Sequence, residues 1–380
     1  MPKSYIKNSA DTKMNPRPVP VTLLTGFLGS GKSTLLSLIL CDLRFRSTAV
    51  VVNEFGEVGL DGDLIQHSQE QFVEMTSGCL CCTIRGDIRE TLLDLHHRCL
   101  QGQIPMVERL VVETTGLADP APVLHTLMTD ATLAGRYMLN GVVTTIDTIN
   151  GAASLARHSE CVKQVAVADR IVLTKTDLAG DAASHCDLQA LRCTIAKLNP
   201  SAPILDRNGP DFDYQSLFNI PGFCPASKVN EVQEWLNAEA YANPQQYHVH
   251  RQHNHEQHHD AHDVNRHGTD VQSFSLILEE PVAAMGFMIA IELLIANQGE
   301  EMLRVKGIVH IAEKPDNPAI INGVQHIFHP LVWLDKWPNE DRRTKIVFIT
   351  RNISKETIKT FFKAWQHYDK ETEERLRPQT

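Results

Sequence analysis

The chain has 380 residues, of which 42% are apolar, and its formal net charge is −10. This length exceeds one ordinary domain and the apolar content is enough for buried cores, so we expect a globular protein of two domains. The negative charge argues against a nucleic-acid-binding surface. The sequence shows neither a signal-peptide pattern nor an apolar run of about 18 residues that would cross a membrane, so we place the protein in the cytoplasm.

The first predicted elements surround a glycine-rich loop. Residues 1–18 are polar and proline-rich, and we expect a disordered N-terminus there. The apolar run VPVTLLT (19–25) predicts a strand, and LLSLIL (35–40) predicts a helix. Between them, GFLGSGKST (26–34) matches the phosphate-loop pattern G-x-x-x-x-G-K-[ST] in the required order of strand, loop and helix. The alternative is a glycine-rich turn that binds nothing.

The residue types in this loop suit a nucleoside triphosphate and its Mg²⁺ ion. Glycines let backbone N–H groups turn inward around phosphate oxygens, and the following helix adds its positive N-terminal end. We expect Lys32 to reach the β and γ phosphates as a catalytic residue, and Ser33 to ligate Mg²⁺. The predicted nucleotide-binding residues of the loop are Gly26, Gly29, Ser30, Gly31, Lys32, Ser33 and Thr34.

An acidic loop and a cysteine cluster come next. STAVVVNEFGEVGLD (47–61) predicts a strand that leads into a loop containing Glu54 and Glu57, and GCLCC (78–82) follows. Nine cysteines, an odd number, are scattered along the chain, which favours reduced thiols with metal or redox chemistry over disulfides.

Cys79, Cys81 and Cys82 are candidate metal ligands. Thiolates are soft ligands that suit Zn²⁺ or Cu(I), and the Cys-x-Cys spacing of Cys79 and Cys81 can place two sulfurs on one ion. We therefore favour Cys79 and Cys81 over Cys82 as metal ligands. Cys82 or a nearby glutamate or histidine would complete a tetrahedron, with Glu54 and Glu57 as the candidate glutamates. Two alternatives stay open: the cysteines fill a buried turn, or two of them form a redox pair.

RLVVETTGLADP (109–120) predicts a buried strand that ends in Glu113. An acid at a strand end, with Gly116 three residues further on, is typical of the carboxylate that holds Mg²⁺ or its water and of the backbone that senses the γ-phosphate. We therefore predict Glu113 as a catalytic and Mg²⁺-binding residue. No glutamine follows to orient a water molecule, so we expect slow intrinsic hydrolysis.

The next segments extend the same alternation of strands and helices. MLNGVVTTIDTIN (138–150), RIVLTKTDL (170–178) and PILDRN (203–208) each predict a strand. The second of them ends in Thr174-Lys175-Thr176-Asp177, which resembles the guanine-binding motif of P-loop GTPases and favours GTP over ATP. The fold class that follows is α/β, a P-loop NTPase with a mostly parallel sheet, helices on both faces and ligands at the carboxyl ends of the strands.

Residues 241–270 break this pattern with almost no apolar residue. Such a composition cannot bury a core, so we expect a mobile linker between two domains. Neutral imidazoles bind Zn²⁺, Ni²⁺, Cu²⁺ or Co²⁺ and would form a loose auxiliary metal collector; the alternative is a polar linker with incidental histidines. The histidines are His248, His250, His253, His255, His258, His259, His262 and His267.

The remaining residues, 271–370, predict a smaller α+β domain. Strands are expected at 271–280, 302–311, 324–334 and 344–350, and helices at 285–298 and 354–365, the last capped by Ser354. This order predicts an antiparallel sheet beside the first domain, which we expect to span residues 19–240. We interpret the histidines of this domain, at 310, 326 and 329, as ordinary strand or edge residues.

GFLGSGKST, NEFGE, GCLCC, ETTGLADP and TKTDL, in this order, resemble the CobW-like metallochaperone GTPases, which are more distantly related to UreG and HypB. The resemblance covers residues 19–210 and, more loosely, 271–365. It implies a GTPase that binds a transition metal beside its nucleotide and delivers it to a client. Lys32 and Ser33 would then hold phosphate and Mg²⁺, and Thr174, Lys175 and Asp177 the nucleotide base. Cys79, Cys81 and Cys82, with a switch-loop glutamate, would hold the metal.

We therefore predict a GTP-hydrolysing metallochaperone that uses GTP, Mg²⁺ and Zn²⁺, with Co²⁺ or Ni²⁺ as other candidate metals. Its partner would be a client metalloprotein, not nucleic acid or a membrane; the sequence names neither the client nor the oligomeric state. Two other functions fit part of the sequence. A passive zinc buffer would need only thiols and histidines, and a P-loop kinase for a small metabolite would prefer ATP.

Overall fold

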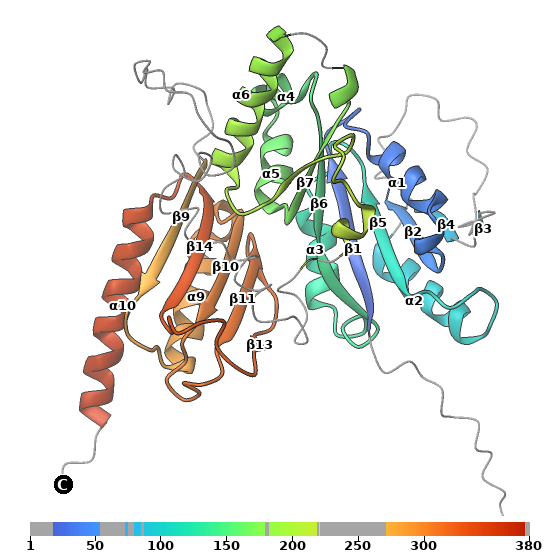
Figure 1. Ribbon diagram of the computed structural model, residues 1–380. Helices are drawn as coiled ribbons and strands as arrows, with labels where there is room; N and C mark the ends of the chain where they lie inside the picture. Colours follow the sequence, from blue (N-terminus) through green and yellow to red (C-terminus); the bar gives the residue numbers. More distant parts are fainter. Residues whose placement is uncertain are drawn as a thin grey trace, which may run out of the picture.

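The structure is a computed structural model, and its ribbon shows two sheets side by side (Figure 1). The predicted N-terminal segment, except residue 18, lies outside the described residues, as do the acidic loop and the His-rich linker. The described residues are 18–53, 73–74, 80–84, 87–178, 182–218, 220 and 271–376.

The first sheet has eight strands in the order β3-β4-β2-β5-β1-β6-β7-β8. Every neighbouring pair is parallel except β3 and β4, which are antiparallel. The strands are β1 (Val19–Gly26), β2 (Thr48–Asn53), β3 (Val73–Glu74), β4 (Leu80–Ile84), β5 (Arg109–Thr114), β6 (Tyr137–Asp147), β7 (Arg170–Thr174) and β8 (Ile204–Asp206). The predicted α/β class with a mostly parallel sheet is confirmed.

Helices connect these strands and cover the sheet. They are α1 (Lys32–Cys41), α2 (Ile88–Leu100), α3 (Ala121–Thr129), α4 (Gly151–Arg157), α5 (Ser159–Val167) and α6 (Ala182–Leu198). The last six residues of β1 and the last five of β5 are buried, as expected for strands covered on both faces. One apolar cluster joins the sheet to α1, α2 and α3, and another joins it to α4, α5 and α6.

The second sheet is antiparallel, with the path β12-β11-β10-β14-β9 and β13 paired to β11. Its strands are β9 (Val271–Leu278), β10 (Arg304–Val309), β11 (Ala319–Val324), β12 (Ile327–Phe328), β13 (Val332–Trp333) and β14 (Thr344–Arg351). Two helices, α9 (Ala284–Gln298) and α10 (Lys355–Leu376), pack on it through Phe287 and Phe362, and Ser354 Oγ caps α10 by accepting the Thr357 N–H at 3.1 Å.

One predicted strand of this domain is wrong. The segment 324–334 is not a single strand: it contains the end of β11, a tight turn, β12 and β13. Pro330 interrupts it, because proline has no N–H for a sheet ladder. The sequence reasoning also missed β11, whose six residues are all buried although Asn322 and Gly323 suggest a loop.

The two domains are joined by a buried charged cluster. The Asp169 carboxylate, at the start of β7, accepts from Arg304 Nη2 at 2.8 Å and from Lys306 Nζ at 2.9 Å, and all three side chains are at most 2% exposed. Around this cluster, Ile308 and Val347 of the second sheet share an apolar cluster with the first domain. The C-terminal domain is therefore docked on the first through a desolvated interface.

Candidate functional site

The phosphate loop connects β1 to α1 and takes its shape from three glycines. Gly26, Gly29 and Gly31 all have positive φ, a backbone conformation that residues other than glycine rarely adopt. A Cβ on Gly26 would lie 2.3 Å from Thr145 Oγ1, so no side chain fits there. Ser30 Oγ is hydrogen-bonded to Thr145 Oγ1 at 2.7 Å, which anchors the loop to β6.

Lys32, Ser33 and Glu113 converge at the carboxyl ends of β1 and β5. Ser33 Oγ donates to Glu113 Oε1 at 2.9 Å. Lys32 Nζ donates to the carbonyl oxygens of Gly26 and Phe27 at 2.6 and 3.2 Å. Burial lowers the pKa of Lys32, and the nearby Glu113 carboxylate opposes that shift. The hydroxyl, the carboxylate and the ammonium predicted from sequence thus occupy one site.

The segment after β5 lies across the phosphate loop. A Cβ on Gly116 would lie 2.6 Å from the Leu28 backbone nitrogen, so the two backbones are in close contact. Thr114 Oγ1 donates to Thr25 Oγ1 at 2.8 Å and ties the end of β5 to β1. Gly116 therefore lies directly against the phosphate loop.

The guanine-binding motif follows β7 and contacts the same loop. Thr174 Oγ1 donates to the carbonyl oxygen of Ser30 at 2.8 Å. Lys175 has a φ of 59° and its Nζ donates to Asp147 Oδ2 at 2.7 Å. The Asp177 carboxylate accepts from Asn208 Nδ2 at 2.6 Å. The described residues of both predicted nucleotide motifs thus form one continuous site.

Sequence reasoning missed several residues of this site. Asp147 ends β6 and orients Lys175, while Asn208 follows β8 and orients Asp177. Both lie in segments that the sequence predicts as strands, and a polar residue at the end of a parallel strand was the signal that could have found them. Gln164, which is fully buried on α5, donates to the carbonyl oxygen of Gly116 and carries no such signal.

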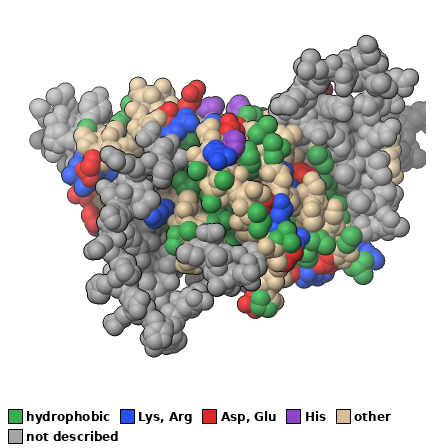
Figure 2. Space-filling view, turned by 90° about the horizontal axis from the view of Figure 1, so that it is seen from above, with side chains coloured by type: hydrophobic (Ala, Val, Ile, Leu, Met, Phe, Trp, Pro, Cys, Tyr) green, Lys and Arg blue, Asp and Glu red, His purple; other side chains and the backbone are tan. Residues whose placement is uncertain are grey.

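The rim of the site carries apolar surface. Figure 2, a view from above, shows exposed apolar side chains among charged ones on the described surface. Leu28 of the phosphate loop, Leu117 of the segment after β5 and Leu178 beside Asp177 are 58%, 45% and 65% exposed. A molecule that binds at this rim can therefore contact apolar as well as polar side chains.

Only part of the predicted metal motif is described. Cys81 and Cys82 belong to β4, where they align with Val50 and Val51 of β2. Cys79, Glu54, Glu57 and the His-rich linker lie outside the described residues. Among the residues that the structure does describe, no group of three or more His, Cys, Asp and Glu side chains could hold a metal ion.

The histidines of the C-terminal domain have contacts of three kinds. The His310 ring meets Trp337 edge-on, and the His326 ring lies 6.1 Å from that of His125 on α3. His329 Nδ1 lies 2.8 Å from the carbonyl oxygen of Pro330.

No helix in the described ranges is long and apolar enough to cross a bilayer.

A phosphate loop, an acid at the end of the neighbouring strand and a guanine-binding motif at one edge of a parallel sheet define a P-loop GTPase. The profile described as "CobW/HypB/UreG, nucleotide-binding domain" matches residues 20–206, and "Cobalamin synthesis protein cobW C-terminal domain" matches residues 271–366. The chain belongs to this CobW family of GTPases.

The most informative relative is a zinc chaperone. Over 345 residues the chain is 33% identical to "Zinc chaperone YjiA" from Escherichia coli, which covers 91% of this chain and 98% of the relative. The crystal structure of Zn(II)-bound YjiA GTPase has a TM-score of 0.68 at 31% identity, covering 92% of this chain and 99% of that one. A YjiA variant with one glutamate and two cysteines replaced by alanine, also Zn(II)-bound, matches with the same values.

Proposed function

We propose that this GTPase is a metallochaperone that binds a transition metal, Zn²⁺ first of all, at its C-x-C-C motif. It would deliver that metal to a client metalloprotein in a way that depends on the bound nucleotide. One observation carries the proposal: the strand that contains Cys81 and Cys82 and the strand that contains Glu113 are both paired with β2.

The register of these strands supports the proposal. On β2, Val50 aligns with Cys81 of β4 on one side and with Val111 of β5 on the other. Two residues further along β2, Val52 aligns with Glu113. β2 ends at Asn53, which directly precedes Glu54 in the sequence. The strand that carries Cys81 and Cys82 is thus separated from the strand that carries Glu113 only by β2, which supports coupling between nucleotide and metal.

The nucleotide side of the proposal uses the residues of the described site. Ser33 Oγ and Glu113 Oε1, 2.9 Å apart, are oxygen ligands of the kind that Mg²⁺ prefers. Lys32 would neutralise charge on the β and γ phosphates, and Asp177 would accept hydrogen bonds from guanine. Mg²⁺ would supply charge neutralisation between the phosphates.

The metal side uses Cys79, Cys81 and Cys82 with Glu54 or Glu57, and the His-rich linker as an auxiliary collector. Thiolate ligands favour Zn²⁺ over harder ions, with Co²⁺ or Ni²⁺ as other candidates. YjiA supports this assignment because it is called a zinc chaperone and because a glutamate and two cysteines were the residues replaced in its variant. That variant is nevertheless Zn(II)-bound, so the motif must be tested apart from other metal-binding groups.

We also propose a division of the chain into domains. Residues 19–240 would form the GTPase domain with its metal site, residues 241–270 a linker, and residues 271–370 the C-terminal domain. The protein would act in the cytoplasm on a client whose identity is open.

The motif is tested by zinc competition against a chelator, with GDP present. Cys81→Ser is expected to weaken the tightest zinc affinity at least tenfold and to leave GTP binding unchanged, because a hydroxyl is a poor ligand for this metal. Cys41→Ser is the matched control, since Cys41 is an exposed thiol outside the motif.

Each variant is measured in the full chain and in a chain lacking residues 245–267, so that the histidines do not mask the thiol site. An unchanged zinc affinity in Cys81→Ser without these residues would show that the C-x-C-C motif is not the metal site.

A further inference from the structure

The segment 115–120 connects β5 to α3 and is called the sensor loop below. It lies against the phosphate loop at Gly116, as described above, and α5 holds it there. Gln164 of α5 is fully buried, and its Nε2 donates to the carbonyl oxygens of Gly116 and Ala118 at 3.1 and 3.2 Å. The position of the Gly116 backbone therefore depends on one amide side chain from another element.

Asp119 holds the other end of the sensor loop and joins three parts of the molecule. Its Oδ1 accepts the Ala121 N–H at 2.9 Å, which caps the start of α3. Its Oδ2 accepts from Lys163 Nζ of α5 at 2.8 Å and from Gln325 Nε2 of the C-terminal domain at 3.2 Å. Burial acts to raise the pKa of Asp119, but these donors outweigh it and hold the pKa below its ordinary value. Asp119 is therefore ionised at neutral pH, and both of its carboxylate oxygens accept hydrogen bonds.

Gln325 reaches Asp119 from an unfavourable backbone position. It begins the two-residue turn between β11 and β12 and has a φ of 54°, in the left-handed region where glycine or asparagine is preferred. A residue other than glycine is strained in this region. The side chain at this position is the one that donates to Asp119, which glycine could not do.

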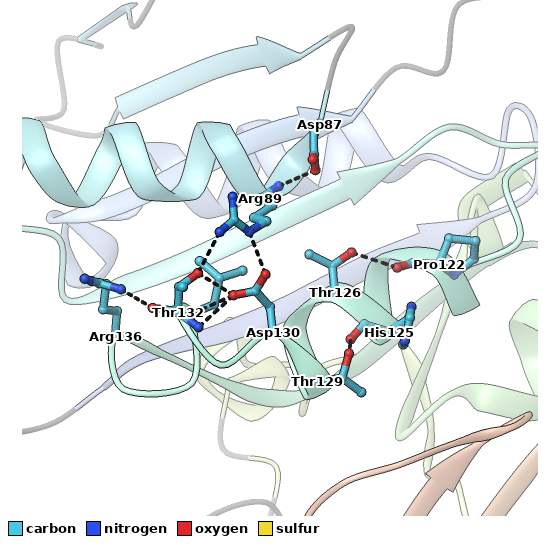
Figure 3. Close-up of polar contacts among 10 residues, drawn as sticks. Asp87, Arg89, Pro122, His125, Thr126, Thr129, Asp130, Thr132 and Arg136 are labelled. Atoms are coloured by element: carbon cyan, nitrogen blue, oxygen red, sulfur yellow. Dashed lines mark hydrogen bonds and ion pairs between the residues drawn. The ribbon is translucent and has the colours of Figure 1, made fainter.

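The same turn also contacts α3, and the far end of α3 is anchored separately. His326 follows Gln325 and its ring lies 6.1 Å from that of His125. At the other end, Asp130 Oδ2 accepts from Arg89 Nε of α2 at 2.6 Å (Figure 3). In Figure 3, His125 points away from Arg89. Helix α3 thus lies between α2 of the GTPase domain and the C-terminal domain, with the sensor loop at its start.

We propose that the sensor loop couples GTP to the C-terminal domain. Gln164 is the positioning residue for Gly116, and Gln325 is the contact through which the C-terminal domain responds to the loop and restrains it. The Gln164 Oε1 atom is buried without a hydrogen-bond partner among the described residues. A buried acceptor without a partner is unfavourable, and an N–H group of a shifted sensor loop would satisfy it.

Coupling of this kind is reciprocal. If the γ-phosphate shifts the sensor loop and the loop shifts Gln325, then whatever binds or moves the C-terminal domain must change the preference for GTP over GDP by the same factor. The inference rests on GTPase activity and on the contacts of the described residues. It does not depend on the C-x-C-C motif or on the identity of any metal.

The test compares the dissociation constants of GDP and of a non-hydrolysable GTP analogue, with Mg²⁺, in the full chain. Gln325→Gly removes the amide at a position whose φ suits glycine, so the turn itself is kept. The expected result is a change of at least about threefold in the ratio of the two constants, which a general loss of structure would not produce because it would weaken both nucleotides.

Ser273→Ala is the matched control. Ser273 Oγ donates to the carbonyl oxygen of Lys197 at 2.9 Å, a contact between the same two domains that does not involve the sensor loop. It is expected to leave the ratio unchanged. A ratio in Gln325→Gly equal to that of the wild type would overturn the role of Gln325.

A second variant tests Gln164. Gln164→Met keeps the volume of the side chain and removes its donors, so Gly116 loses its restraint. The affinity for the GTP analogue is expected to fall at least threefold while GDP binding is retained, and kcat for GTP hydrolysis is expected to fall with it. Equal loss for both nucleotides, or no loss for either, would show that Gln164 only fills space.

Discussion

In the proposed function, nucleotide binding depends most directly on Lys32. Its side chain is 8% exposed and its Nζ is held by two carbonyl oxygens of the phosphate loop. Hydrogen bonds to charged groups contribute about 1.5–3 kcal/mol each. The ammonium group of Lys32 is thus partly desolvated and lies where we expect the phosphates of the nucleotide to bind.

Replacing this residue separates a chaperone from a passive zinc buffer. Lys32→Ala is expected to weaken GTP binding about 10–100-fold, the factor that corresponds to a lost hydrogen bond to a charged group. Zinc binding without nucleotide should persist, but it should no longer respond to GTP. Fluorescent-nucleotide and zinc titrations measure both, with Lys363→Ala on the exposed side of α10 as control. A zinc affinity that still follows GTP in Lys32→Ala would contradict this assignment.

At the scale of elements, the parallel sheet was predictable because its strands are short apolar runs with phosphate and base motifs at their ends. The strand β11 was not, since Asn322 and Gly323 lie in its sequence. The sheet requires that glycine: a Cβ on Gly323 would lie 2.7 Å from the Phe328 ring, so the ring occupies the space that a side chain would need. Such a requirement comes from a residue on another strand and leaves no local pattern.

The site shows the same division. The phosphate loop, Glu113 and the guanine-binding motif were predictable because their chemistry needs fixed spacings along the chain. Asp147, Asn208 and Gln164 act through contacts with residues 28 to 48 positions away. Asp147 and Asn208 had only the general signal of a polar residue at a strand end, and Gln164 had none. Residues that orient a site, rather than form it, were therefore the ones missed.

At the scale of the whole molecule, docking of the two domains depends on Asp169. Arg304, Lys306 and the Val142 N–H all donate to its carboxylate in a fully buried position. Burial acts to raise the pKa of Asp169, but the two cations and the hydrogen bonds outweigh it and lower the pKa to about 2. By contrast, burial lowers the pKa of Lys306 to about 8, and Asp169 limits that shift.

Asp169→Asn is expected to lower the free energy of unfolding by about 3–5 kcal/mol, because it leaves two buried cations without their anion. Urea unfolding measures this, with Asp316→Asn as control: Asp316 pairs with Arg342 at the surface, where 80% and 54% of the side chains are exposed. The control should change stability by less than about 1 kcal/mol.

The stabilisation by Asp169 should depend on pH. The pKa of Asp169 is lower in the folded chain than its unfolded value of 3.8, so its stabilisation is complete above pH 3.8 and is lost as the pH falls toward 2. The difference in unfolding free energy between wild type and Asp169→Asn should therefore shrink over that interval. A difference that stays constant there would show that Asp169 is not the titrating group.

The central claim is that nucleotide and metal binding are linked, and one measurement tests it most directly. Zinc is titrated against a competing chelator, on the chain lacking residues 245–267, with Mg²⁺ and either GDP or a non-hydrolysable GTP analogue. The account predicts zinc affinities that differ at least tenfold between the two nucleotides, a coupling of about 1.4 kcal/mol. Coinciding curves would contradict it, since nucleotide turnover would then have no means of driving metal transfer.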